Sequence, residues 1–307
     1  MLDALIVADV GEGSVKHGGS STPRECPTGA RSDRELQRAQ GSVRLVLAGS
    51  EHGTRIVDVY QQSPLRILFP RIRGGAPEEA VLVNTAGGIA GGDRLESAVT
   101  VVADATATAT SQAAERVYRA LNQPALVTTR LKVDATSRLA WLPQETIVFD
   151  GARLRRSTEI ELSSGAELLA LEWLVLGRAA HGEEMVAGEI TDRWRVKRDG
   201  RLIWADSFHV TDEVLPRLGS PALLADFRSI ATLVYFGPNR EQHFDFMHEQ
   251  GPSLKCRCAA TVVSGLLIAR FAASASFDLK ESLQAALTQF GHAHRSWSFG
   301  PPKMWSV

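Results

Sequence analysis

A glycine-rich segment, residues 84–93, looks at first sight like a loop that binds phosphate. In a Walker loop the last glycine precedes a lysine that contacts the phosphates and a hydroxyl residue that binds Mg²⁺. Here Gly92 precedes Asp93 and Arg94, and an aspartate repels phosphate. The segment therefore argues against nucleotide binding. Its glycines are better explained by a bulged turn with positive φ angles and close backbone approach, at Gly87, Gly88, Gly91 and Gly92.

Other catalytic patterns are incomplete. His181 and Glu183 form the His-x-Glu pair of zinc deaminases, but the Pro-Cys-x-x-Cys partner is missing, because one residue separates Cys256 from Cys258. A metal-dependent enzyme that uses the loop from Gly87 to Asp93 with His181 and Glu183 stays open as an alternative. The two cysteines could hold a soft metal only with ligands from elsewhere, and their role stays open.

Acidic residues beside apolar strands are the other chemical feature. An ionised carboxylate next to apolar surface needs a partner, a water-filled passage or a cation. Oxygen ligands attract divalent ions without holding them as tightly as thiolates do. Arg178 could instead neutralise one of the acids, and solvated strand faces are the plain alternative. The candidates for lining an ion path are Asp93, Glu145, Asp150, Glu172 and Glu183.

The elements that must position these residues are mostly β. From Ser42 onward apolar residues alternate, as in Val43, Leu45 and Leu47. Four units of strand, tight Asp- or Gly-containing turn and return strand then recur, with turns at positions 105, 135, 166 and 200 and steps of 30, 31 and 34 residues. Such a period predicts stacked hairpins or a solenoid-like β stack.

Two helices are predicted, at about residues 112–120 and 278–295. The second has Asp278 as its cap, Glu281 three residues later, and a face of leucines and Phe290. Beyond it the sequence Gly-Pro-Pro-Lys-Met-Trp cannot continue a helix. Trp305 beside prolines is a candidate partner contact, with packing on its own domain as an equal alternative.

Composition narrows the class of protein. The chain has 307 residues and a net charge of −1, so no basic field would hold nucleic acid or an anionic membrane. Three cysteines make no disulfide framework, which indicates a reducing compartment. No signal peptide or membrane span is recognised, so we expect a cytoplasmic protein. Residues 1–40 are predicted to form a flexible tail and residues 41–307 a single domain.

Six segments together resemble the UreD (also called UreH) family of urease accessory proteins, over about residues 41–307. The sequence departs from the family's pattern at Val262-Val263-Ser264-Gly265, at His181 and in Lys303-Met304 of the closing motif, and residues 1–38 have no counterpart. The matching segments, in the family's order, are residues 84–93, 110–119, 141–151, 177–183, 265–270 and 302–305.

The resemblance implies a function that the residues alone leave open. Members of this family are not enzymes and bind no permanent cofactor. They act in the cytoplasm with UreF and the GTPase UreG to load nickel into apo-urease, which they contact directly. The implied fold is a mostly β, solenoid-like stack with two helices, and nickel is thought to pass through its interior. The five acids above would line that passage. A structural β-solenoid adaptor without ion handling is the alternative.

Overall fold

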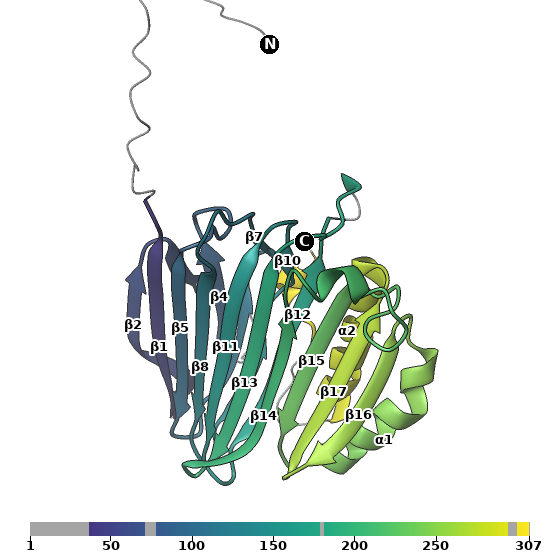
Figure 1. Cartoon of the computed structure of the whole chain (residues 1–307). Helices are drawn as coiled ribbons and strands as arrows, with labels where there is room; N and C mark the ends of the chain where they lie inside the picture. Colours follow the sequence, from purple (N-terminus) through teal and green to yellow (C-terminus); the bar gives the residue numbers. More distant parts are fainter. Residues whose placement is uncertain (1–36, 71–77, 179–180, 294–299, 307) are drawn as a thin grey trace, which may run out of the picture. The chain divides into compact units, whose positions relative to one another are not determined.

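Two facing β-sheets form the body of the protein (Figure 1). The computed structural model describes residues 37–70, 78–178, 181–293 and 300–306, so the expected tail at residues 1–40 lies almost wholly outside it. The first sheet contains, in spatial order, β14 (Arg201–Val210), β13 (Glu189–Arg198), β11 (Arg153–Leu162), β8 (Ala125–Val133), β5 (Arg94–Val102), β1 (Gln40–Ser50) and β2 (Gly53–Gln62).

The second sheet lies behind the first in Figure 1 and extends past its edge strand β14. Two short strands, β7 (Glu115–Val117) and β10 (Thr146–Val148), join it beside β12. Its main path runs through β16 (Arg257–Val263), β17 (Leu266–Ala273), β15 (Ser229–Phe236), β12 (Glu167–Leu176), β9 (Arg138–Leu142), β6 (Thr106–Ser111), β4 (Glu78–Asn84) and β3 (Leu65–Leu68).

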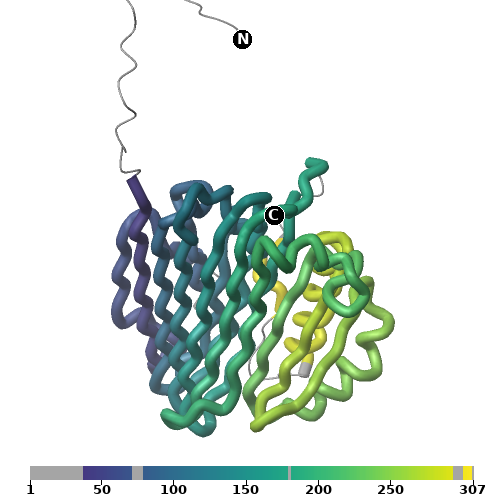
Figure 2. Tube along the Cα trace, in the orientation of Figure 1, coloured from purple at the N-terminus to yellow at the C-terminus, as the bar shows by residue number. Residues whose placement is uncertain are grey.

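The repeated units are turns of a solenoid, as the period predicted. In three of them the chain crosses between the sheets, from β5 to β6, β8 to β9 and β11 to β12, and successive turns pair in parallel (Figure 2). The hairpin interpretation is wrong for these three, because their two strands lie in different sheets. It holds only for β13 and β14, which pair antiparallel. Positive φ angles at Asp104, Thr136 and Gly165 provide the sharp corners.

The apolar core has two layers, one on each face of the second sheet. Even-numbered residues of β12, such as Leu168 and Leu174, pack in the core between the sheets. Odd-numbered ones, such as Leu169 and Trp173, pack in a second core with helix α2 (Ser276–Ala293). Burial on both faces explains why β12 reads as a continuous apolar run. Glu172 is an even-numbered residue and therefore faces the first sheet.

One helix prediction is confirmed and the other is wrong. Helix α2 buries its leucine face fully, although it begins at Ser276, so Asp278 lies within its first turn rather than at its cap. Residues 112–120 instead contain β7, because tertiary pairing of backbone groups outweighs their local helix preference: Glu115 N–H donates to Glu145 O at 2.8 Å and Ile89 N–H to Arg116 O at 2.7 Å.

The other helix is α1 (Arg240–Gln250), a polar segment whose side chains bury little apolar surface. Its sequence shows no amphipathic stripe, which is why periodicity did not reveal it. The proline before it and the Gly251-Pro252 pair after it are the signals that could have marked its two ends. None of the described helices is both long and apolar enough to cross a membrane.

Candidate functional site

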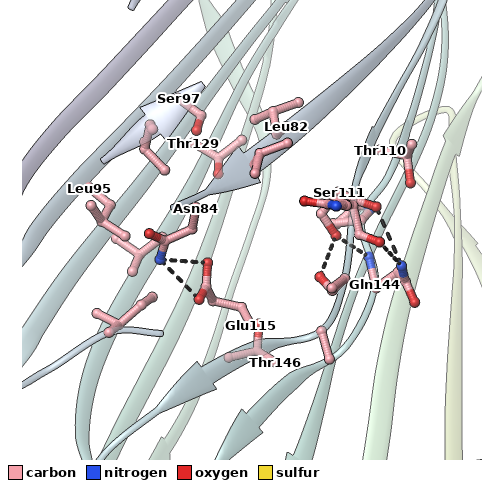
Figure 3. Close-up of a pocket in the computed structure, with 18 of the residues that line it drawn as sticks. Leu82, Asn84, Leu95, Ser97, Thr110, Ser111, Glu115, Thr129, Gln144 and Thr146 are labelled. Atoms are coloured by element: carbon pink, nitrogen blue, oxygen red, sulfur yellow. Dashed lines mark hydrogen bonds between the residues drawn. The ribbon is translucent and has the colours of Figure 1, made fainter. Parts of the chain in front are cut away.

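The first of two adjoining cavities lies inside the β stack and has a volume of about 300 Å³ (Figure 3). Exposed residues such as Gly87 and Gln112 line one part of it, and fully buried ones such as Arg156 and Glu172 line another. It therefore reaches from the surface, at the glycine segment, into the space between the sheets.

A carboxylate lies near the outer part of this cavity. Both oxygens of Glu115 accept hydrogen bonds from Asn84 Nδ2 at 3.1 Å, and the same amide group donates to Gly88 O at 3.2 Å (Figure 3). Burial raises the pKa of Glu115 to about 7, against the opposing effect of the Asn84 hydrogen bonds. Glu115 is thus a group that gains or loses its charge near neutral pH.

An uncharged polar group lines another part of the same wall. The Gln144 backbone N–H donates to Ser111 Oγ at 2.9 Å, and its side-chain amide donates to Gln112 O at 2.8 Å and to Met304 O at 3.3 Å. These bonds fix the loop before β10 against β6 and the closing segment of the chain (Figure 3).

A buried charged cluster ends the first cavity. Arg156 on β11 donates from Nε and Nη2 to the two oxygens of Asp192 at 2.9 and 2.7 Å, and from Nη1 to Glu172 Oε2 at 2.8 Å. Nη1 also lies 3.1 Å from Thr146 Oγ1, and Glu172 Oε1 accepts from Trp141 Nε1 at 2.9 Å. Arg156 and Asp192 belong to the first sheet and Glu172 to the second, so the cluster spans the interior.

Burial and the neighbouring groups shift the pKa values in this cluster in opposite directions. Burial alone would lower the pKa of Arg156, but Asp192 and Glu172 outweigh it and raise the pKa, so the guanidinium stays protonated. Burial raises the pKa of the Glu172 carboxyl, and Arg156 and Trp141 oppose that change.

The second cavity begins at the same cluster. It has a volume of about 480 Å³ and is also lined by Arg156, Glu172 and Asp192. It continues between β14 and the strands that extend the second sheet, to an ion pair between Arg270 and Asp206 at 2.8 Å. The Arg270 side chain is 50% exposed. Two cavities with surface-exposed residues in their walls therefore meet at a buried ion pair, Arg156 with Glu172.

Only one of the five acids proposed from the sequence lines these cavities, namely Glu172. Asp93 is buried in the glycine segment, where its oxygens accept from Ala39 N–H at 2.8 Å and Ala90 N–H at 2.7 Å. Glu145 is half-buried, and among the described residues its Oε2 has no hydrogen-bond partner. It precedes β10 and lines neither cavity.

The remaining two acids, Asp150 and Glu183, line a separate hollow at the surface. Asp150 forms an ion pair with Arg119 and accepts from the Val186 and Ala187 N–H groups at 2.9 Å. Glu183 pairs with Arg178, as the alternative interpretation of these acids expected. That pair and the Asp150 N–H lower the pKa of Glu183. Both carboxylates are occupied by protein partners.

The glycine segment has the backbone geometry predicted for it. Gly87, Gly88 and Gly92 have φ angles of 74°, 151° and 91°. A Cβ on Gly88 would lie 2.4 Å from the Tyr118 ring and 2.8 Å from Arg116 O, and one on Gly91 would lie 2.5 Å from Gln123 O. The segment therefore packs its backbone directly against β7 and the loop after it.

The structure does not support Trp305 as an exposed partner contact. Trp305 is 1% exposed, its ring packs against that of Trp173 at a centroid distance of 5.7 Å, and its Nε1 donates to Leu142 O at 3.2 Å. The side chain thus completes the second core, as the alternative interpretation held. A large aromatic residue near prolines reads the same in sequence whether it packs inward or outward.

The residues of the enzyme alternative do not assemble into a metal centre. His181 is exposed and Glu183 is paired with Arg178. Within the described parts of the chain, no group of three or more His, Cys, Asp and Glu side chains could hold a metal ion. Cys258 Sγ lies 3.7 Å from Met247 Sδ, and burial raises the pKa of the Cys258 thiol to about 12.

Three of the sequence motifs meet at the first cavity: Asn84 comes from the glycine segment, Glu115 from β7, and Gln144 and Thr146 from the segment that leads into β10. A sequence model described as "UreD urease accessory protein" matches residues 39–306. The chain belongs to the UreD family of urease accessory proteins.

Individual relatives match most of the chain. The chain is 39% identical over 277 residues to the urease accessory protein UreD of Mesorhizobium japonicum, covering 88% of this chain and 95% of that protein. It is 38% identical over 288 residues to the UreD protein of Xanthobacter autotrophicus, covering 94% and 97%. Membership of this family supports a role for the chain in urease maturation.

Sequence reasoning missed several charged residues of the site, among them Glu115, Arg156 and Asp192. Glu115 was assigned to a helix, so its inward direction could not be seen. Asp192 and Arg156 lie on strands whose alternation could have revealed them. On β11 the buried residues are Leu154, Arg156, Thr158, Ile160 and Leu162, so the arginine occupies an inward position.

Proposed function

We propose that this chain is a non-enzymatic urease maturation factor that binds apo-urease and, together with UreF and UreG, supports insertion of nickel in the cytoplasm. The proposal rests on membership of the UreD family and on the accessory role in the names of its relatives. Nickel is the cargo, and no permanently bound cofactor is part of the proposal.

We further propose that nickel travels through the two cavities. The observation that carries this proposal is that both cavities end at the same residues, Arg156 and Glu172, while each also has exposed residues in its wall. Carboxylates occur along the whole route, at Glu115, at Glu172 with Asp192, and at Asp206. Oxygen ligands suit a divalent ion that must be released again.

The test replaces single carboxylates of the route and measures two properties of each variant. Glu115→Gln and Glu172→Gln should reduce the nickel content of activated urease several-fold, while pull-downs with UreF stay unchanged. Glu96→Gln is the matched control, because Glu96 lies on β5 with its side chain 55% exposed and paired with Arg130 at 2.9 Å.

Each outcome assigns a different role. Lost UreF binding in the route variants would make Glu115 and Glu172 structural residues. Full nickel content in both would refute the passage and favour an adaptor without ion handling. The same measurements on Asp150→Ala would then show whether the surface hollow, rather than the cavities, acts in maturation.

A further inference from the structure

Two side chains, those of Arg156 and Glu172, line both cavities and mark their junction. Arg156 is 3% exposed, and its guanidinium lies between the carboxylates of Asp192 and Glu172, with Thr146 Oγ1 as a further neighbour. All three of its nitrogens donate to oxygens there. Because Arg156 and Glu172 are the residues that both cavities share, a solute that crosses between the cavities there meets the Arg156 guanidinium.

A fixed positive charge at that point opposes the passage of any cation. Two like charges a few ångströms apart repel strongly where water is scarce. A divalent ion and the guanidinium therefore cannot occupy the junction together. The carboxylates that would attract the ion are also the groups that Arg156 already engages.

The cluster is not needed merely to hold the sheets together. A buried arginine with its carboxylates contributes little more stability than apolar residues of the same volume, because removing the charges from water costs nearly what their attraction returns. Buried apolar side chains lie around it, among them Leu174 and Trp194, both 1% exposed. Three buried charges in such a core call for another role.

Space for movement exists on both sides of the arginine. An arginine side chain has several rotatable bonds, and cavities of about 300 and 480 Å³ adjoin this one. The guanidinium can therefore leave the carboxylates by turning into a cavity rather than by displacing packed atoms. Glu172 would stay in position through its bond from Trp141 Nε1.

We infer that Arg156 is the gate of the proposed passage: its guanidinium closes the junction, and a divalent cation crosses only by taking its place between Glu172 and Asp192. The inference rests on the proposed function, in that nickel is the cargo. It adds the closed state and the two carboxylates that receive the ion when the gate opens.

The gate is tested by the nickel binding of full-length variants, measured by equilibrium dialysis with nickel chloride at neutral pH. Arg156→Met removes the charge and keeps a similar side-chain volume. This variant should bind one more nickel ion per chain than the wild type. It should bind that ion at least tenfold more tightly than the wild type binds nickel at the junction, if the wild type binds any there. The thermal transition of this variant, unlike that of the wild type, should rise with nickel concentration.

Two controls locate the extra ion. The triple variant Arg156→Met, Glu172→Gln, Asp192→Asn should lose it, because no charged oxygen remains at the junction. Arg155→Met, on the same strand but with a 56% exposed side chain, should bind as the wild type does. All variants keep the same histidines and cysteines, so background binding cancels.

If Arg156→Met fails to fold, a second variant tests the gate. Arg156→Lys keeps a positive charge but cannot donate to Asp192 as a fork, so nickel should displace it at a concentration at least tenfold lower than in the wild type. Folded variants that bind no more nickel than the wild type overturn the gate. Nickel delivery to urease by Glu172→Gln tests the passage separately from the gate. If Arg156→Met gains a nickel ion but Glu172→Gln delivers as much nickel as the wild type, the junction is a cation site and the passage is refuted.

Discussion

Glu115→Gln tests the electrostatics of the first cavity without any partner protein. Burial raises the pKa of Glu115 from its ordinary value of 4.5 to about 7. A raise of this size corresponds to roughly 3 kcal/mol between the charged and neutral forms. The folded protein thus disfavours the Glu115 carboxylate, and a glutamine of the same shape removes that cost.

The sign of the pH dependence follows from proton binding. Between pH 4.5 and 7 the folded protein holds a proton on Glu115 that the unfolded chain has released, so the wild type loses stability as pH rises through this window. Above pH 7 both states are ionised and the full cost is present. Glutamine does not titrate, and it keeps one hydrogen bond from Asn84 while losing another that contributes about 1 kcal/mol.

Glu115→Gln should therefore be about 2 kcal/mol more stable than the wild type at pH 8 and no more stable at pH 5. Urea unfolding at four pH values from 5 to 8, at constant ionic strength, gives the difference in unfolding free energy. Other titrating groups cancel in that difference, and Glu96→Gln should stay within about 0.5 kcal/mol throughout. A difference that does not change with pH would refute the claim that burial controls this carboxyl.

Three further predictions concern residues that the structure assigns to packing or to backbone hydrogen bonds. Trp305→Ala should lower the free energy of unfolding by about 3–5 kcal/mol in urea titrations, since it empties a fully buried site; a loss below about 1 kcal/mol would contradict its place in the core. Gly88→Val should yield mostly insoluble or strongly destabilised protein, because its Cβ would meet Arg116 O; normal expression and melting would argue against the tight contact. Asp93→Ala should cost about 1–3 kcal/mol by leaving the Ala39 and Ala90 N–H groups without their acceptor, with nickel delivery by the folded fraction unchanged; a selective loss of delivery would return Asp93 to the ion path.

The sequence predicts the features that depend on local patterns, and it fails where the structure depends on contacts between residues far apart in the chain. Alternation and the repeated turns predicted the β stack, because they reflect which face of each strand is buried. The segment around Glu115 was misassigned, because its structure is decided by backbone partners far away in sequence. The direction of Trp305 also depends on a distant surface, the Trp173 ring. The five acids lie beside apolar strands in the sequence, a pattern that does not distinguish a cavity wall from a carboxylate held by backbone N–H groups, as in Asp93.

The solenoid period also relates residues of the site to one another. Residues one turn apart stack on each other, and several contacts of the site join residues separated by 31 positions: Asn84 with Glu115, Trp141 with Glu172, and Arg119 with Asp150. Glu115 in turn pairs with Thr146, again 31 residues on. A step of 31 also lies among those found between the turns of the sequence recurrence. Applying that step to the motif residues would have placed Glu115 beside Asn84 and Thr146, and Glu172 beside Trp141. What the period cannot supply is the contact between the sheets, and the meeting of Arg156 with Glu172, only 16 residues apart, is of that kind. Alternation on β11 marks Arg156 as an inward residue, but only the folded structure reveals its contact with Glu172.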